Sequence, residues 1–299
     1  MKLEKRKFGR TDMEVTALGF GAAEIGITDL PEQEAIRLLQ EVLDTGINVV
    51  DTASTYNNSE ELIGKAISDR RDSYYLFTKC GEAQSVGLDY PDWDPRAVRP
   101  SIERSLKRMK TDYVDLVQIH SCSEAILRQG GLIEELQKAR AAGLTRYIGY
   151  SGDSTDALYA VETGVFDTLQ TSINIADQEA LDLFLSEARQ RELGIIAKRP
   201  VANVVWKRPQ DAVNRPDEYE KRLDKLDFGF IGEDPKAAIG TALRFTLAHA
   251  DIAIVGTTNM EHLRDNLQDA GKGPLEREQL ERIRARWQER REPAWAGKT

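Results

Sequence analysis

The chain contains little cysteine, little histidine and no long apolar segment. Its 299 residues include only two cysteines, Cys80 and Cys122, and three histidines. The thiols form neither a metal-ligand spacing nor a disulfide framework, so we expect no metal site. No apolar run approaches the ~18 residues that cross a bilayer, and no apolar core follows the charged segment Met1–Lys7, as it would in a signal peptide. We therefore expect a cytoplasmic protein with no membrane partner.

Positive charge is also scarce. Lysine and arginine total 41 against 50 aspartates and glutamates, a formal net charge of -9. This field repels phosphate backbones and argues against a nucleic-acid partner, although a local basic pocket for one small anion stays possible. Apolar residues make up 40% of the chain, which is enough for a core and is typical of a globular protein rather than a disordered one.

No linker rich in proline, glycine or serine divides the chain, so we predict one domain over residues 1–299. Strand-like and helix-like segments alternate eight times along it. The strands are expected at Ala17–Gly21, Asn48–Asp51, Tyr75–Lys79, Val114–His120, Tyr147–Ser151, Thr168–Ile173, Gly194–Lys198 and Ile252–Val255. The helices are expected at Gln33–Leu43, Ser59–Ser68, Arg96–Met109, Leu132–Ala142, Thr155–Thr163, Gln178–Glu192, Pro235–Ala250 and Glu261–Asp269.

The expected strands are short and apolar without alternation, which is typical of a parallel sheet buried on both faces. Two short β segments, Glu4–Phe8 and Glu14–Thr16, precede the eight units, and a charged helix, Pro274–Arg291, follows them. The pattern predicts an α/β fold, a (β/α)8 TIM barrel with an N-terminal β-hairpin and a C-terminal helix. The alternative is an open doubly wound sheet, but the segment Gly19–Glu24 lacks the third glycine of its nucleotide-binding fingerprint.

Polar residues end several of the expected strands. Asp51, Lys79, His120 and Ser151 end the second to fifth strands, and Tyr56 follows Asp51 by five residues. The carboxyl ends of barrel strands converge on one face, and neighbouring strands lie about 4.8 Å apart. We therefore expect these side chains to lie within reach of one another.

This set of side chains can transfer a proton. A free tyrosine, with a pKa of about 10, is a weak acid at neutral pH, and a nearby ammonium group favours its phenolate. Lys79 can supply that ammonium, and Asp51 can hold it in place. His120 can donate a hydrogen bond to a substrate oxygen: its neutral form would orient a carbonyl, and its charged form would relay a proton. None of these groups donates hydride, so carbonyl reduction would require a cofactor.

Further motifs follow one another along the chain. They are Leu18–Gly21, Asp51–Ala53 with Tyr56 and Glu60, Thr78-Lys79, Ser101–Leu106, and Asp112–Leu116 leading to His120. With the opening hairpin, they resemble the aldo-keto reductase superfamily over nearly the whole chain. The resemblance implies an NAD(P)(H)-dependent oxidoreductase that interconverts a carbonyl (an aldehyde, ketone or sugar) and an alcohol.

The resemblance also implies site residues. Asp51, Tyr56, Lys79 and His120 match the catalytic tetrad, in which Tyr56 is the general acid of reduction and the general base of oxidation. The cofactor would lie across the barrel mouth on Gly21, Ala22, Asp51, Ser151, Gln170, Lys198, Arg199, Gly256, Thr257, Asn259, His262, Asp265 and Asn266. Ser151 and Gln170 match positions that hold the nicotinamide carboxamide. The substrate would contact Tyr56, His120, Trp93 and Trp206.

The chain departs from the family pattern at three places. Gly152-Asp153 follow Ser151 where many members have asparagine. Gly256 and His262 stand where many members place the lysine and arginine that hold the 2′-phosphate of NADP. We favour NADP(H), with NAD(H) possible. The segment Ala22–Glu24 lacks an aromatic residue that is often found there, and Trp93 and Trp206 would replace its surface.

Several alternatives stay open. The same fold would also suit a nucleotide-binding sensor with little turnover, although such a protein has no need of all four tetrad groups. The polar stretch Lys207–Asp234 is expected to be a substrate lid, or else a plain surface insertion. Cys80 and Cys122 adjoin Lys79 and His120, so they form either a redox switch or, as we favour, small buried apolar residues. The oligomeric state does not follow from the sequence.

Overall fold

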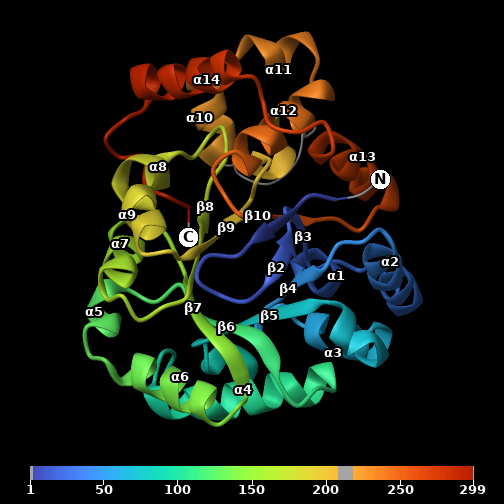
Figure 1. The fold of residues 1–299 in the computed structure, drawn as a ribbon, viewed down its shortest axis with the longest axis vertical. Helices are drawn as coiled ribbons and strands as arrows, with labels where there is room; N and C mark the ends of the chain where they lie inside the picture. The colour runs from blue at the N-terminus through green and yellow to red at the C-terminus, as the bar shows by residue number, and fades with distance from the viewer. Residues whose placement is uncertain (1–2, 208–217, 299) are drawn as a thin grey trace.

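The computed structural model describes residues 3–207 and 218–298. Eight parallel strands close into a barrel in the order β10-β3-β4-β5-β6-β7-β8-β9 (Figure 1). The strands are β3 (Leu18–Gly21), β4 (Val49–Asp51), β5 (Tyr75–Cys80), β6 (Val114–His120), β7 (Thr145–Ser151), β8 (Thr168–Ser172), β9 (Gly194–Lys198) and β10 (Ile252–Gly256). Strand β10 pairs with both β9 and β3, which closes the sheet and confirms the predicted (β/α)8 barrel.

Helices surround the barrel in Figure 1. They are α1 (Ala23–Ile27), α2 (Glu32–Asp44), α3 (Ser59–Ala66), α4 (Pro95–Met109), α5 (Glu124–Leu127), α6 (Gly131–Ala141), α7 (Ser154–Glu162), α8 (Glu179–Leu183), α9 (Leu185–Gln190), α10 (Glu218–Leu226), α11 (Gly229–Glu233), α12 (Ala237–Leu247), α13 (Met260–Ala270) and α14 (Arg277–Arg290). Three 3-10 segments are η1 (Ser68–Ser73), η2 (Gln84–Val86) and η3 (Ala202–Lys207).

Local sequence explains where these helices form. In α2, Ala35, Leu38, Leu39 and Val42 are buried at intervals of three and four residues, the spacing that turns one helix face toward the core. The expected helix Gln178–Glu192 is instead two helices, α8 and α9. They are separated at Phe184, whose φ of -144° is not helical and whose side chain is buried. Burial of that aromatic ring outweighs the local helix pattern.

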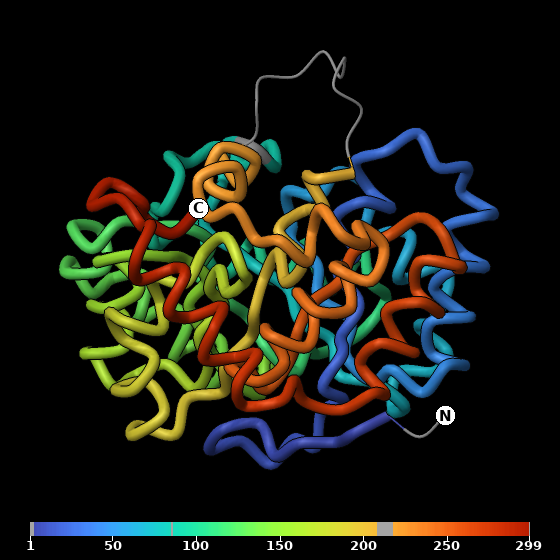
Figure 2. Tube along the Cα trace, turned by 90° about the horizontal axis from the view of Figure 1, so that it is seen from above, coloured from blue at the N-terminus to red at the C-terminus, as the bar shows by residue number. Residues whose placement is uncertain are grey.

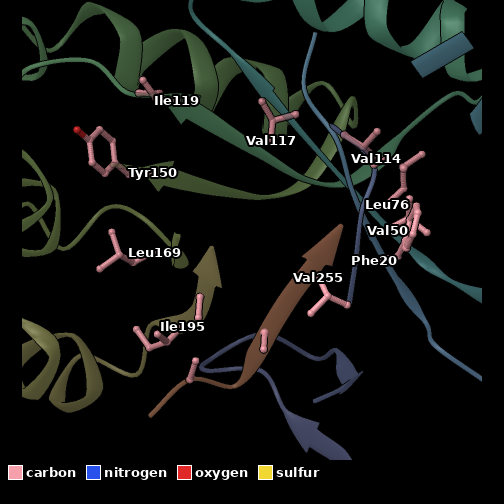
Figure 3. Close-up of a cluster of buried hydrophobic side chains, with 14 of the residues drawn as sticks. Phe20, Val50, Leu76, Val114, Val117, Ile119, Tyr150, Leu169, Ile195 and Val255 are labelled. Atoms are coloured by element: carbon pink, nitrogen blue, oxygen red, sulfur yellow. The ribbon is translucent and has the colours of Figure 1, made fainter. Parts of the chain in front are cut away.

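The barrel interior is apolar at one end. The hairpin of β1 (Lys5–Lys7) and β2 (Glu14–Thr16) lies across that end, in dark blue in Figure 2. The hairpin and the strands together bury Phe8, Met13, Val15, Val49, Phe77, Leu116, Ile196, Ile252 and Ile254. A larger apolar layer lies between the strands and the helices, and Figure 3 labels ten of its residues, all carried by barrel strands. We therefore expect the reactive side chains at the carboxyl ends of the strands.

Buried carboxylates tie neighbouring strands together where the strands begin. Asp115 accepts a hydrogen bond from the Leu76 amide at 2.9 Å and pairs with Arg71 at 2.6 Å and Arg146 at 2.7 Å. Asp167 accepts in the same way from Ile148, and Asp251 from Ile195. Each carboxylate thus satisfies a buried backbone amide of the neighbouring strand, which would otherwise lack a hydrogen-bond acceptor.

We expect Asp115→Ala to lower the free energy of unfolding by about 3–5 kcal/mol, because it leaves the buried Leu76 amide without its acceptor and removes the buried carboxylate that compensates the charges of Arg71 and Arg146. Urea denaturation measures the loss. The control is Glu103→Ala, which removes a carboxylate that is 50% exposed and pairs with Arg99 on the surface of α4. That variant should lose no more than about 1 kcal/mol. Equal losses in the two variants would contradict the assignment.

Part of the polar stretch Lys207–Asp234 is helical. Its described part forms α10 and α11, and α10 buries Tyr219, Leu223 and Leu226 against Trp287 of α14 and neighbouring apolar residues. Figure 1 shows α10, α11, α12 and α14 together on one side of the barrel. The one aromatic side chain of α10, Tyr219, thus belongs to a second core. Residues 208–217 of the expected lid lie outside the described residues, so the lid stays a prediction.

Candidate active site

A cavity of about 1570 Å³ opens at the carboxyl ends of the strands. The sequence-predicted residues that line it are Gly21, Asp51, Tyr56, His120, Ser151, Gln170, Lys198, Arg199, Gly256, Thr257, Asn259, His262, Asp265 and Asn266. Four other predicted residues do not line it: Ala22, Lys79, Trp93 and Trp206. The barrel therefore brings residues from both ends of the chain to one mouth.

Lys79 and Asp51 form a buried ion pair beneath this cavity. The Lys79 side chain is 1% exposed, and its Nζ lies 2.6 Å from Asp51 Oδ2 and 2.9 Å from the Thr52 carbonyl oxygen. Burial lowers the pKa of Lys79, but Asp51 and the Tyr56 phenol oppose this, and the net pKa of Lys79 is raised. The ammonium group is therefore charged at neutral pH despite its burial.

Tyr56 lies between this pair and the cavity. Its ring centroid is 5.2 Å from Lys79 Nζ, and the phenol raises the pKa of that ammonium. The rings of Tyr56 and His120 meet edge to face, with centroids 6.1 Å apart and planes at 85°. Both residues line the cavity. A proton-donating phenol and an imidazole thus meet at one wall, with an ammonium group directly beneath the phenol.

Amide side chains support the other oxygen of Asp51. Asp51 Oδ1 accepts hydrogen bonds from Gln170 Nε2 at 3.1 Å and Gln118 Nε2 at 3.4 Å, and Ser151 Oγ donates to Gln170 Oε1 at 3.0 Å. Gln118 was not predicted as a site residue. A signal was present, since a glutamine interrupts an apolar strand two residues before His120 and thus on the same face.

Arg108 of α4 holds the loop that carries Tyr56. Its guanidinium group donates to the carbonyl oxygens of Ser54, at 3.4 Å, and Asn57, and it pairs with Glu60 at 3.3 Å. Glu60 is fully buried and also accepts from Thr78 Oγ1 at 2.8 Å. The sequence analysis placed Glu60 in a motif. It did not indicate Arg108, because the partners of Arg108 lie about fifty residues earlier in the chain.

His120 is held at both its ring and its backbone. Its Nδ1 lies 2.8 Å from Glu82 Oε2, and its carbonyl oxygen accepts from Trp93 Nε1 at 2.9 Å. Trp93 therefore contacts the His120 backbone rather than the cavity wall. Trp206 donates to the Pro235 carbonyl oxygen and packs on the α10 core, and Ala22 is buried. Glu82 was not predicted as a site residue.

The next part of the cavity wall carries buried charges. Lys198 pairs with Asp153 at 2.8 Å, and burial lowers the pKa of Lys198 although Asp153 opposes the shift. Asp153, two residues after Ser151, also accepts from Thr171 and Ser172. Arg199 donates to the Lys298 carbonyl oxygen, so the C-terminal segment returns to β8, as Figure 1 shows.

The far end of the cavity has a mixture of charges. Glu24 and His262 line it, and burial raises the pKa of Glu24 while His262 opposes this. Lys236 and Lys272 also line it, paired with Asp265 at 3.5 Å and Asp269 at 2.5 Å. Asn259 caps α13 by accepting from the Glu261 amide at 2.7 Å. The N-terminus of this helix faces the cavity and suits an anion.

The two cysteines lie in the core. Cys80 is 1% exposed and Cys122 is fully buried, and burial raises the pKa of each thiol to about 12. Thiols of this kind are unreactive at neutral pH, because the thiolate is the reactive form. The geometry favours the interpretation of both as small buried apolar residues.

The residues that the structure describes are 3–207 and 218–298. No helix among them combines the length and apolarity that crossing a membrane requires. No group of three or more histidine, cysteine, aspartate or glutamate side chains among them is arranged to hold a metal ion.

Known proteins resemble this chain over nearly its whole length. A profile of the Aldo/keto reductase family matches residues 17–288. L-galactose dehydrogenase of Arabidopsis thaliana is 30% identical over 284 residues, 89% of this chain and 88% of that protein. The uncharacterized oxidoreductase YqkF of Bacillus subtilis is 27% identical and covers 95% of this chain and 96% of its own. The structure of aldo-keto reductase AKR11C1 from Bacillus halodurans matches with a TM-score of 0.83 at 27% identity, covering 95% and 96% of the two chains.

The fold, the cavity and the family profile agree with one another. The chain belongs to the Aldo/keto reductase family and is an oxidoreductase of that family.

Proposed function

We propose that the protein interconverts a carbonyl and an alcohol with a nicotinamide dinucleotide as hydride carrier. The observation that carries this proposal is the buried Lys79–Asp51 pair directly beneath Tyr56, at a cavity wall shared with His120. In reduction, Tyr56 donates a proton to the carbonyl oxygen, and Lys79 stabilises the charge left on the phenolate. In oxidation, the same phenolate removes the proton of the alcohol.

The cavity fits the cofactor. Its volume of about 1570 Å³ exceeds the 300–1,000 Å³ typical of pockets for single drug-sized ligands, which leaves space for a dinucleotide and a substrate. Ser151 and Gln170 would hold the carboxamide, Lys198 and Arg199 the pyrophosphate, and residues 256–266 the adenosine. When bound, the nicotinamide supplies or accepts the hydride that no side chain here can transfer.

The proposed preference is NADP(H), and it depends on basic side chains at the far end of the cavity. His262, Lys236 and Lys272 line that end and are the groups that would contact a 2′-phosphate. A second candidate is NAD(H), because Glu24, Asp265 and Asp269 share the same wall and neutralise part of this positive charge. The ribose hydroxyl of NAD(H) can donate to such carboxylates.

Titration with NADPH and NADH, followed by quenching of tryptophan fluorescence, tests both binding and preference. We expect saturable binding of at least one, and a carbonyl-dependent loss of absorbance at 340 nm in the same mixture. Sugars and their lactones belong in the substrate panel with simple aldehydes and ketones, since one relative is named for L-galactose. Tight cofactor binding without turnover of any carbonyl would instead favour a sensor.

A further inference from the structure

Glu82 stands outside the four predicted tetrad residues and yet contacts one of them. It follows Lys79 by three residues, in the loop after β5, and its side chain is 19% exposed. Oε2 lies 2.8 Å from His120 Nδ1, and His120 itself is 17% exposed. The His120 ring also meets the Tyr56 ring edge to face, and both residues line the cavity.

The loop geometry brings Glu82 to this position. Gly81 has a φ of +130°, and a Cβ atom there would lie 2.9 Å from Trp93 Cδ1. Only glycine adopts this conformation without strain. The Trp93 amide donates to the Gly81 carbonyl oxygen, and the Trp93 indole donates to the His120 carbonyl oxygen. Trp93 therefore joins the loop carrying Glu82 to the end of β6.

The contact determines which ring nitrogen carries the proton. An ionised carboxylate only accepts hydrogen bonds, so at 2.8 Å from Glu82 the His120 Nδ1 must be the donor. In a neutral imidazole the other nitrogen, Nε2, is then an acceptor. A neutral His120 in this tautomer accepts a hydrogen bond from an alcohol, and only the doubly protonated ring can donate to a carbonyl oxygen. This differs from the sequence-based expectation that neutral His120 orients a carbonyl.

We propose that Glu82 is a positioning residue that keeps a proton on Nδ1 of His120 and so fixes the orientation in which Nε2 meets the substrate oxygen. The role in orienting the substrate rests on the proposed carbonyl–alcohol chemistry. The tautomer of His120 rests only on its contact with Glu82. Negative charge on Glu82 also stabilises the doubly protonated ring that carbonyl reduction then uses.

Nitrogen NMR of the imidazole rings tests the tautomer without any substrate. The chain has only three histidines, and His120→Asn identifies the signals of His120. In the wild-type protein the neutral His120 ring should show a protonated Nδ1 and an unprotonated Nε2. Glu82→Leu should move the proton toward Nε2. A neutral wild-type ring protonated on Nε2 and not on Nδ1 overturns the proposal, even in an active enzyme.

Steady-state kinetics separate the hydrogen bond from simple loss of a carboxylate. Glu82→Leu should lower kcat for carbonyl reduction by about 10²-fold while the Kd for the cofactor stays unchanged, because the imidazole loses the carboxylate that stabilises its doubly protonated form and fixes its orientation. Glu82→Gln keeps an acceptor oxygen, so its kcat should be no more than about tenfold below that of the wild type. Equal kcat values for the leucine and glutamine variants would show that the acceptor does not position the ring, and a wild-type kcat for Glu82→Leu would overturn the role.

A matched control is Glu135→Leu. Glu135 lies on α6, is 27% exposed and pairs with Lys138 at 2.7 Å, so the substitution removes the same charge at a similar exposure but away from the cavity. It should leave kcat and the His120 signals unchanged. Absence of turnover in the wild-type protein would contradict the proposed function, whereas the NMR result would still decide the role of Glu82.

Discussion

Tyr56→Phe is expected to lower kcat for carbonyl reduction by about 10²- to 10⁴-fold, which is the usual contribution of a positioned general acid. The substitution removes one oxygen atom and keeps the ring that packs edge to face on His120. The phenol oxygen is a proton donor at this wall, and its ring centroid lies 5.2 Å from the Lys79 ammonium, whose pKa it raises. Affinity for the cofactor should change by less than about twofold, because the variant changes no predicted cofactor contact.

Stopped-flow absorbance at 340 nm with a saturating carbonyl measures the loss, and fluorescence titration measures the cofactor Kd. Tyr159→Phe is the control, since Tyr159 on α7 stacks with Arg128 and does not line the cavity. It should behave as the wild type. Wild-type turnover in Tyr56→Phe would show that the proton comes from another group, and a large rise in the cofactor Kd would mean that the phenol serves binding.

Lys79→Met is expected to damage stability and catalysis together. Removing the ammonium leaves Asp51 charged or protonated in a site where its side chain is 5% exposed. The uncompensated charge should lower the free energy of unfolding by about 3–5 kcal/mol, as measured by urea denaturation. Turnover should fall by at least about 10³-fold, because the phenolate formed during reduction loses its stabilising charge.

The double variant Lys79→Met/Asp51→Leu separates the two effects. Replacing both partners by apolar groups removes the buried charge, so much of the lost stability should return. Activity should not return, since neither the ammonium nor its support is present. A double variant no more stable than Lys79→Met would contradict the interpretation of this pair as mutually compensating buried charges. Recovered activity would contradict the role of Lys79 in supporting Tyr56.

Much of the fold could be predicted from local patterns. Apolar segments such as Val114–His120 coincide with strands, and α2 follows the spacing of its apolar residues. The prediction failed where tertiary packing overrides local preference. Phe184 breaks an expected helix to bury its ring, and α10 forms within a segment that looked like a polar loop, because Tyr219 and its neighbours bury apolar surface against α14.

The site was predicted in part. Residue types at the strand ends indicated Asp51, Lys79 and His120, because parallel strands bring such positions to one face. The supporting partners were not indicated. Glu82 is 38 residues from His120 along the chain, Gln118 is 67 from Asp51, and Arg108 is 48 from Glu60. Nothing in the local pattern marks one glutamate or arginine among many as the one that makes such a contact.

The sequence by itself determined the alternation of eight strands and helices, the end of the barrel at which the reactive groups emerge, and the kinds of side chain gathered there. These properties depend on periodicity and on composition over a few neighbouring residues. Only the tertiary structure decided that Lys79 lies beneath the cavity rather than in its wall, that Trp93 and Trp206 are not among the lining residues, and that Glu82 contacts His120. Those outcomes depend on distances between residues far apart in the chain, which barrel closure and side-chain packing set together.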